Sequence, residues 1–254
     1  MKLLVSPKDE DEALEAVSGG ADIIDVKNPS EGSLGANFPW VIRRIRKLVP
    51  RNIEVSATLG DLPNLPGTAS LAALGAAAVG ANYVKVGLLG PSSFSDAVFL
   101  MGNVVRSVKE WDPSIKVVAA AYADWKRTGT LDPLLIPEIA AKSGSHVAMI
   151  DTKLKDGRRL FDFLTSTDLD LFVERSHDRG LSAALAGSLQ KADVSILTKL
   201  KVDVIGVRTA VCEGLNRVSG RISRWKVREL IDAIKETESD TGLKGNLARG
   251  EVVV

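Results

Sequence analysis

Cysteine is almost absent from this sequence. Cys212 is the only one among 254 residues, so the chain cannot form an intrachain disulfide and fits a reducing compartment. Long apolar runs are missing as well, which excludes a membrane-spanning helix. The amino terminus, MKLLVSPKDEDE, turns acidic too early to contain the apolar core of a signal peptide. We therefore expect a soluble, cytoplasmic protein with no membrane partner.

The sequence also lacks an excess of charge of either sign. Its 33 lysines and arginines nearly balance 32 aspartates and glutamates, which leaves no basic surface for nucleic acid. With only two histidines and one cysteine, the sequence has no cluster of metal ligands. The motifs GxGxxG, GxxxxGK[ST] and GxSxG are absent. We expect neither a metal nor a dinucleotide cofactor, and the sequence leaves open whether the chain forms a homo-oligomer.

What the sequence does contain is a regular alternation of short apolar runs and longer helical patterns. Nearly continuous apolar runs are typical of parallel strands that are buried on both faces. The predicted strands are Lys2–Ser6, Asp22–Lys27, Ile53–Thr58, Tyr83–Leu88, Lys116–Tyr122, Val147–Thr152, Ser182–Gly187 and Asp203–Arg208. The predicted helices are Glu10–Ser18, Pro39–Leu48, Ala69–Val79, Ser95–Glu110, Leu134–Ser143, Asp168–Arg179, Gln190–Leu200 and Ser223–Thr237.

This alternation predicts a single α/β domain, a (β/α)8 TIM barrel. Strands that alternate with helices imply parallel pairing through right-handed crossovers, and a chain of this length fits one barrel. The alternative is an open doubly wound sheet, but its usual GxGxxG signature is missing after the first strand. No linker divides the chain, so we expect the barrel to span residues 1–237 and a C-terminal tail to follow at 238–254.

Charged residues occupy positions where barrel strands are expected to be apolar. Lys85 lies in the middle of YVKVGL, and a buried lysine is costly unless it is paired or belongs to a site. Asp25 and Lys27 share one strand face, as do Asp151 and Lys153, because side chains alternate with a period of two. All lie near the carboxyl ends of their strands, where barrel enzymes carry their chemistry. This placement favours an active site over a set of structural ion pairs.

Lysines beside aspartates are suited to amine catalysis. A lysine amine attacks a carbonyl only when it is neutral; burial or a neighbouring ammonium lowers its pKa, and a carboxylate raises it. Two neighbouring lysines can therefore divide the work, one forming a Schiff base and the other donating protons. The aspartates would then transfer protons and hold the lysines in place.

The loops after the seventh and eighth strands predict a phosphate site. In barrel enzymes these two loops and a nearby helix amino terminus usually bind phosphate. Gly187, followed by Ser188, would let backbone N–H groups approach a phosphate, and Arg208 would pair with it in bidentate fashion. Thr209 belongs to the segment Gly206–Ala210, which closes the eighth strand and leads toward an expected short helix. A plain turn is the alternative interpretation of the glycine–serine pair.

Eight segments spread over the chain resemble a known family. They are LLVSP, GGADIIDVKNPSEGSLGANFPW, VSATLGD, YVKVGL, VVAAAYAD, VAMIDTKLKDG, ALAGS and IGVRTAVC. The chain resembles the (5-formylfuran-3-yl)methyl phosphate synthases of methanofuran biosynthesis, also called 4-(hydroxymethyl)-2-furancarboxaldehyde-phosphate synthases. The resemblance implies a TIM-barrel lyase that condenses two molecules of glyceraldehyde 3-phosphate, with loss of phosphate and water.

The resemblance also implies roles for individual residues. Carried over by position, Lys27 would form the Schiff base and Lys85 would donate or accept protons. Asp25, Asp151 and Lys155 would assist.

A short internal recurrence points to a different lysine after the sixth strand. The segment Ile24–Lys27 recurs as Ile150–Lys153 half a chain later, which would place Lys153 in the site. The family pattern places the lysine in Lys155-Asp156-Gly157 instead, and we follow the family pattern.

Two other functions remain compatible with these residues. Lysine–aspartate barrels serve many reactions, so one alternative is a class I aldolase or a decarboxylase acting on another phosphorylated sugar. The other is a non-catalytic barrel that binds a phosphorylated metabolite. Borohydride trapping with a triose phosphate separates them, because a covalent adduct excludes a pure binder and the released product distinguishes the enzymes.

Overall fold

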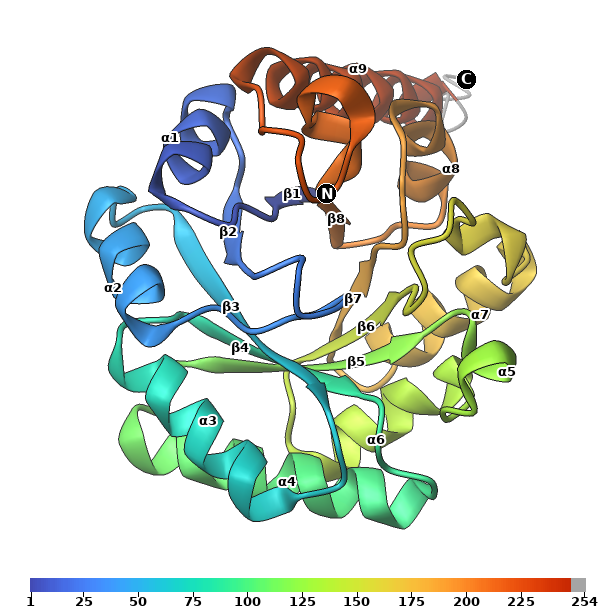
Figure 1. Cartoon of the computed structure of the whole chain (residues 1–254). Coiled ribbons are helices and arrows are strands. Elements are labelled where there is room, and N and C mark those ends of the chain that lie inside the picture. Colours follow the sequence, from blue (N-terminus) through green and yellow to red (C-terminus); the bar gives the residue numbers. More distant parts are fainter. Residues whose placement is uncertain (248–254) are drawn as a thin grey trace.

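Eight parallel strands close into a barrel that is surrounded by helices (Figure 1). The computed structural model describes residues 1–247. The strands are β1 (Lys2–Val5), β2 (Ile23–Val26), β3 (Glu54–Leu62), β4 (Tyr83–Leu88), β5 (Lys116–Tyr122), β6 (Val147–Asp151), β7 (Ser182–Leu185) and β8 (Val204–Val207). Because β8 pairs with β1, the sheet has no open edge, which confirms the predicted TIM barrel over the open sheet.

The surrounding helices follow the predicted order. They are α1 (Glu10–Gly19), α2 (Pro39–Leu48), α3 (Pro66–Ala78), α4 (Phe94–Trp111), α5 (Trp125–Thr128), α6 (Ile136–Ser143), α7 (Ser166–His177), α8 (Val194–Lys199) and α9 (Arg224–Leu247). The single turn α5 lies in the loop after β5 and was not predicted. Within the described range, no helix is both long and apolar enough to cross a membrane.

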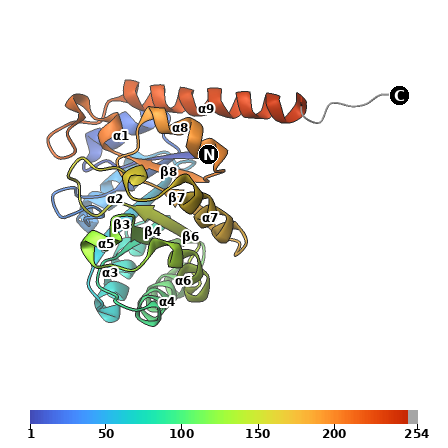
Figure 2. The ribbon, with the colours of Figure 1, turned by 90° about the vertical axis from the view of Figure 1, so that its right-hand side faces the viewer.

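Two elements, β3 and α9, extend well beyond their predicted ends. β3 runs to Leu62 and carries Asp61 beyond the predicted end at Thr58, with a register shift against β4 between these two residues. α9 continues to Leu247, so the part of the predicted tail at 238–247 is helical, and it projects past the barrel in Figure 2. The remaining tail residues, 248–254, lie outside the described part of the chain.

Capping residues fix where several helices begin and end. The Asp9 carboxylate accepts a hydrogen bond from the Glu12 N–H at 3.0 Å and caps the amino terminus of α1. The helix ends at Gly20, whose φ of 98° is left-handed and turns the chain toward β2. Thr165 and Asp168 form a reciprocal capping box at the start of α7.

Alternation along the strands separates two cores. On β4, Val84 and Val86 pack between strand and helices in the larger outer core. Tyr83 points to the barrel interior, and Lys85 lines the pocket there. The interior core consists of Leu34, Tyr83, Val118, Ala120, Tyr122, Val147, Met149, Ala184 and Ala186. Apolar residues therefore fill the body of the barrel, and charged residues gather at the carboxyl ends of the strands.

The loop between β2 and α2, residues 28–37, crosses the mouth of the barrel (Figure 1). We call it the roof loop. Its Leu34 is fully buried in the interior core. Its Ser33 Oγ donates a hydrogen bond to the Thr152 carbonyl oxygen at 2.7 Å, and Thr58 Oγ1 donates to the Gly35 carbonyl oxygen at 2.7 Å. The roof loop is thus fixed to β3 and to the segment after β6.

We predict that Gly87→Ala destabilises the barrel by about 1–3 kcal/mol, the usual cost of overpacking a core. A Cβ atom at Gly87 would lie 2.2 Å from the hydroxyl of buried Tyr122 and 3.0 Å from the Gly60 carbonyl oxygen. Gly102→Ala on α4 is the control, because no atom lies within 4 Å of its added Cβ. Urea unfolding should give a lower midpoint for the first variant only; equal midpoints would contradict the close approach.

Candidate active site

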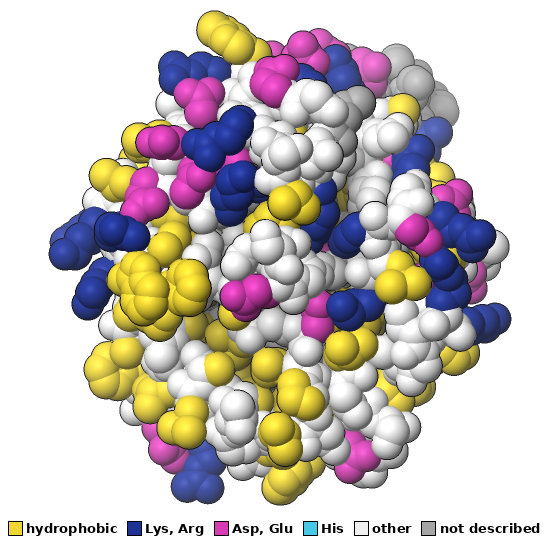
Figure 3. All heavy atoms as spheres, viewed as in Figure 1, with side chains coloured by type: hydrophobic (Ala, Val, Ile, Leu, Met, Phe, Trp, Pro, Cys, Tyr) yellow, Lys and Arg dark blue, Asp and Glu magenta, His cyan; other side chains and the backbone are white. Residues whose placement is uncertain are grey.

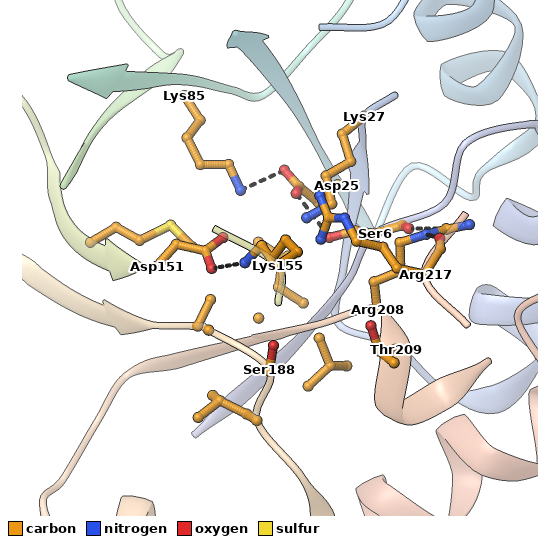
Figure 4. A pocket seen from close by; sticks show the side chains of 17 residues that line it. Ser6, Asp25, Lys27, Lys85, Asp151, Lys155, Ser188, Arg208, Thr209 and Arg217 are labelled. Atoms are coloured by element: carbon orange, nitrogen blue, oxygen red, sulfur yellow. Dashed lines mark hydrogen bonds and ion pairs between the residues drawn. The ribbon is translucent and has the colours of Figure 1, made fainter. Parts of the chain in front are cut away.

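One pocket inside the barrel mouth gathers the residues that the sequence assigned to chemistry (Figure 4). Figure 3 shows this face, with lysine and arginine side chains around the central opening. The predicted residues that line the pocket are Asp25, Lys27, Lys85, Asp151, Lys155, Gly187, Ser188, Arg208 and Thr209. Ser6 and Arg217, which the sequence analysis did not select, line it too.

Asp25 and Lys85 form an ion pair in the barrel interior. The strand β3 lies between β2 and β4, and the Lys85 Nζ reaches the Asp25 Oδ1 at 2.8 Å. The Ser6 hydroxyl donates to the other carboxylate oxygen at 3.1 Å. Burial alone would raise the pKa of Asp25, but the charges of Lys85 and Lys27 and the hydrogen bonds to the carboxylate together outweigh it and hold that pKa below its ordinary value. Asp25 is therefore a carboxylate that is already committed to Lys85.

Lys27 follows β2 and is buried without a carboxylate partner. Its Nζ forms one hydrogen bond in the described structure, to the Ser33 carbonyl oxygen at 3.5 Å. Burial, reinforced by the positive charge of Arg217, lowers the pKa of Lys27 well below its ordinary value, although Asp151 and Asp25 oppose this. The Lys27 amine thus has the property that nucleophilic attack requires.

Lys155 folds back over the mouth onto Asp151. Its Nζ lies 2.7 Å from the Asp151 Oδ1 and 2.9 Å from the Thr152 Oγ1. Burial lowers the pKa of Lys155, and the charge of Asp151 opposes that effect. The pKa of Asp151 is in turn lowered, because Lys155 and Lys27 outweigh the effect of its burial. This is a second lysine–aspartate pair, built on β6, which stands across the closed barrel from the β2 strand that carries Asp25.

Lys153 belongs to a different network. Its Nζ lies 3.0 Å from the Asp61 Oδ2, and the same carboxylate accepts the backbone N–H of Ser33 at 3.1 Å and the hydroxyl of Tyr122. Lys153 therefore helps to fix the roof loop. It lines a second, outer hollow between the roof loop and the loops after β6 and β8. The structure places Lys155, and not Lys153, on Asp151.

Asp124 holds the backbone of the loop after β6, which carries Lys153 and Lys155. It is almost fully buried after β5, and its two oxygens accept the backbone N–H groups of Lys153 at 2.7 Å and Leu154 at 2.8 Å. These hydrogen bonds turn the chain so that the side chain of Lys155 returns to the pocket. Asp124 is thus a positioning residue for Lys155.

Gly187 and Ser188 form a tight turn at the end of β7. Their φ angles are 112° and 55°, both in the left-handed region. A Cβ atom at Gly187 would lie 3.0 Å from the Thr152 Cγ2. In the described part of the chain, the backbone N–H groups of these two residues form no hydrogen bond. They are free to bind an anion that enters the pocket.

Arg208, which we expected to bind phosphate, is paired with Glu12 in the structure. Its Nη1 lies 2.7 Å from the Glu12 Oε2 and its Nη2 lies 3.2 Å from the Glu12 Oε1, and both side chains are almost fully buried. The Arg208 Nε donates to the Arg217 carbonyl oxygen at 2.7 Å. The bidentate pairing that we expected with phosphate is thus made with Glu12, because α1 brings this carboxylate to the end of β8. Arg208 holds the loop that carries Arg217.

Four polar residues of this region escaped the sequence analysis. Ser6, Asp61 and Asp124 each stand at or just beyond the end of a barrel strand, and Arg217 lies in the loop after β8. A polar residue directly after an apolar strand is the signal that could have identified the first three. The loop after the eighth strand was considered only at its start, so Arg217 was passed over.

The chain was compared with known proteins. Residues 3–231 match the family model for 4-HFC-P synthase. The (5-formylfuran-3-yl)methyl phosphate synthase of Methanocaldococcus jannaschii is 55% identical over 92% of this chain and 100% of its own length. The enzyme of the same name from Methanothermobacter thermautotrophicus is 55% identical over 91% of this chain and 97% of its own.

Solved structures match in fold. The 3-hexulose-6-phosphate synthase of Salmonella typhimurium aligns with a TM-score of 0.66 over 93% of this chain and 100% of its own, at 19% identity. The phosphoribosyl anthranilate isomerase of Thermus thermophilus gives 0.63 over 93% and 99%, at 15% identity. At these identities the likeness establishes the barrel fold alone.

We predict that Glu12→Ala lowers the free energy of unfolding by about 3–5 kcal/mol, because it leaves the buried Arg208 guanidinium without a counter-ion. Asp11→Ala on the same helix is the control, since the Asp11 side chain is 87% exposed. Urea unfolding of both variants measures the difference. Similar losses in the two variants would contradict the account of Arg208 as a structural cation.

Proposed function

The chain belongs to the 4-HFC-P synthase family, and from this membership and the geometry of the pocket we propose its reaction. The enzyme condenses two molecules of glyceraldehyde 3-phosphate to (5-formylfuran-3-yl)methyl phosphate, with loss of phosphate and water. It is a carbon–oxygen lyase that acts on phosphates and serves methanofuran biosynthesis. The observation that carries the proposal is the buried Lys27 amine, which has no carboxylate partner among the described residues. Two lysine–aspartate pairs line the same pocket.

In this proposal Lys27 forms the covalent intermediate. Its neutral amine attacks the carbonyl carbon of a triose phosphate, and loss of water from the resulting carbinolamine gives a Schiff base. Water must leave and protons must move at each step. Lys85 lies on one side of the pocket with Asp25, and Lys155 lies on the other with Asp151. Each ammonium can donate a proton and then recover it through its paired carboxylate.

The phosphate of this first substrate would bind at the end of β7. Gly187 and Ser188, whose backbone N–H groups form no hydrogen bond within residues 1–247, line the same pocket as Lys27, and Thr209 lines it from the β8 loop. Backbone N–H groups suit an anion because they bring partial positive charge without a counter-ion of their own. This anchoring would hold the carbonyl near the Lys27 amine.

We predict that Lys27→Ala abolishes both product formation and the adduct that borohydride traps with glyceraldehyde 3-phosphate. Lys27→Arg should be equally inactive, because a guanidinium stays protonated and is a poor nucleophile. Mass spectrometry of the trapped protein and of the released product measures both. An adduct that forms in the alanine variant at the wild-type rate would place the nucleophile elsewhere; an aldol product would indicate a different reaction.

We predict that Lys155→Ala lowers kcat/KM by at least about a hundredfold, at the low end for a proton-transfer group. Lys153→Ala is the matched control two residues away, and its kcat/KM should stay within a few-fold of wild type. Because Lys153 pairs with Asp61, that variant should show its effect in a lower melting temperature. Circular dichroism checks the fold of both. An inactive Lys153 variant beside an active Lys155 variant would reverse the assignment.

A further inference from the structure

Arg217 lies where the inner pocket opens into an outer hollow. The outer hollow is bounded by the roof loop, the loop after β6 and the loop after β8. The residues that line both the pocket and the hollow are Lys155, Ser188, Thr209 and Arg217. In Figure 4 the Arg217 side chain reaches toward the interior beside Lys27 and Asp25. Arg217 therefore lies at the junction of the pocket that holds Lys27 and the outer hollow.

Arg217 is held in place by backbone groups and not by a carboxylate. Its Nη2 donates to the carbonyl oxygens of Gly32 at 2.9 Å and Ser33 at 2.8 Å. Over residues 1–247, Nε and Nη1 have no hydrogen-bond partner, and no carboxylate lies within ion-pair distance. A partly buried arginine without a counter-ion is costly, and binding an anion would recover that cost.

Among the described residues that line the pocket, Arg217 is a cation without a paired carboxylate. Lys85 is paired with Asp25, Lys155 with Asp151, and Arg208 with Glu12. Two further basic residues, Lys27 and Arg217, line the pocket, and burial together with the charge of Arg217 lowers the pKa of Lys27, which favours its neutral form. Arg217, which lines both the pocket and the outer hollow, is therefore a positive charge that a bound anion would compensate.

We propose that the outer hollow is a second anion subsite, in which Arg217 binds the phosphate of the second triose phosphate. The inference rests on the proposed function, which brings two phosphorylated trioses together. The first would be bound covalently at Lys27 with its phosphate at Gly187 and Ser188. The second would then enter above it, with Arg217 Nε and Nη1 as donors to its phosphate. Lys155, which lines both spaces, stands between the two substrates.

The test compares wild type with Arg217→Gln, Arg217→Lys and Arg158→Gln. Arg158 is an exposed arginine on the neighbouring loop after β6, so its variant controls for the loss of one charge at the rim. In Arg217→Gln we expect KM for glyceraldehyde 3-phosphate to rise about tenfold to a hundredfold, the usual value of a charge-assisted hydrogen bond. The borohydride-trapped adduct at saturating triose should stay at the wild-type amount per chain, since the first subsite is intact.

A pH profile distinguishes this role from a purely structural one. Removing the positive charge raises the pKa of Lys27, so the acidic limb of adduct formation should move to higher pH in Arg217→Gln. Arg217→Lys keeps the charge and should keep the wild-type limb. A loosened roof loop would affect both variants alike.

Crystals soaked in inorganic phosphate test the subsite without the reaction. We expect phosphate density at Arg217 in wild type and its loss in Arg217→Gln, with density at Gly187 and Ser188 in both. Phosphate at Arg217 in an enzyme that makes no furan would overturn the proposed function but support the subsite. Unchanged KM in Arg217→Gln relative to Arg158→Gln, or no phosphate at Arg217, would overturn the subsite.

Discussion

The two aspartates that line the pocket, Asp25 and Asp151, are each already paired with a lysine, and the proposed chemistry depends on that constraint. Asp25 is paired with Lys85, and Asp151 with Lys155, at 2.8 Å and 2.7 Å. A third lysine in the same pocket is left without a close counter-ion, and burial then favours its neutral form. Removing either pairing lysine would free a carboxylate for Lys27 and raise its pKa. The pKa of Lys27 thus depends on the pairing of the neighbouring aspartates as well as on its own burial.

The roof loop links this electrostatic arrangement to the fold. Its backbone contacts Lys27 through Ser33, is held to β3 by Asp61 and Thr58, and accepts both hydrogen bonds of Arg217. The same loop places Leu34 inside the barrel, so its position is fixed by apolar packing as well as by hydrogen bonds. Lys27 is 5% exposed, and the roof loop beside it is held by contacts from β3, the loop after β6 and the loop after β8.

The barrel could be predicted from the sequence because its strands are short apolar runs separated by helices with clear ends. The site could be predicted where a charge interrupts such a run, as at Lys85, since burial without function or pairing is costly. The partner of Arg208 could not be predicted, because Glu12 belongs to a helix nearly two hundred residues earlier and only barrel closure brings them together. The different positions of Lys153 and Lys155 likewise could not be predicted, because they depend on Asp61 of β3 and on Asp124 after β5.

The central claim, a neutral Lys27 amine, can be measured directly by titrating isotope-labelled lysine side chains with nuclear magnetic resonance in the substrate-free enzyme. One lysine amine should titrate well below the ordinary value of about 10.4, and its signal should be missing in Lys27→Ala. A Lys27 amine that titrates at the ordinary value would contradict the account.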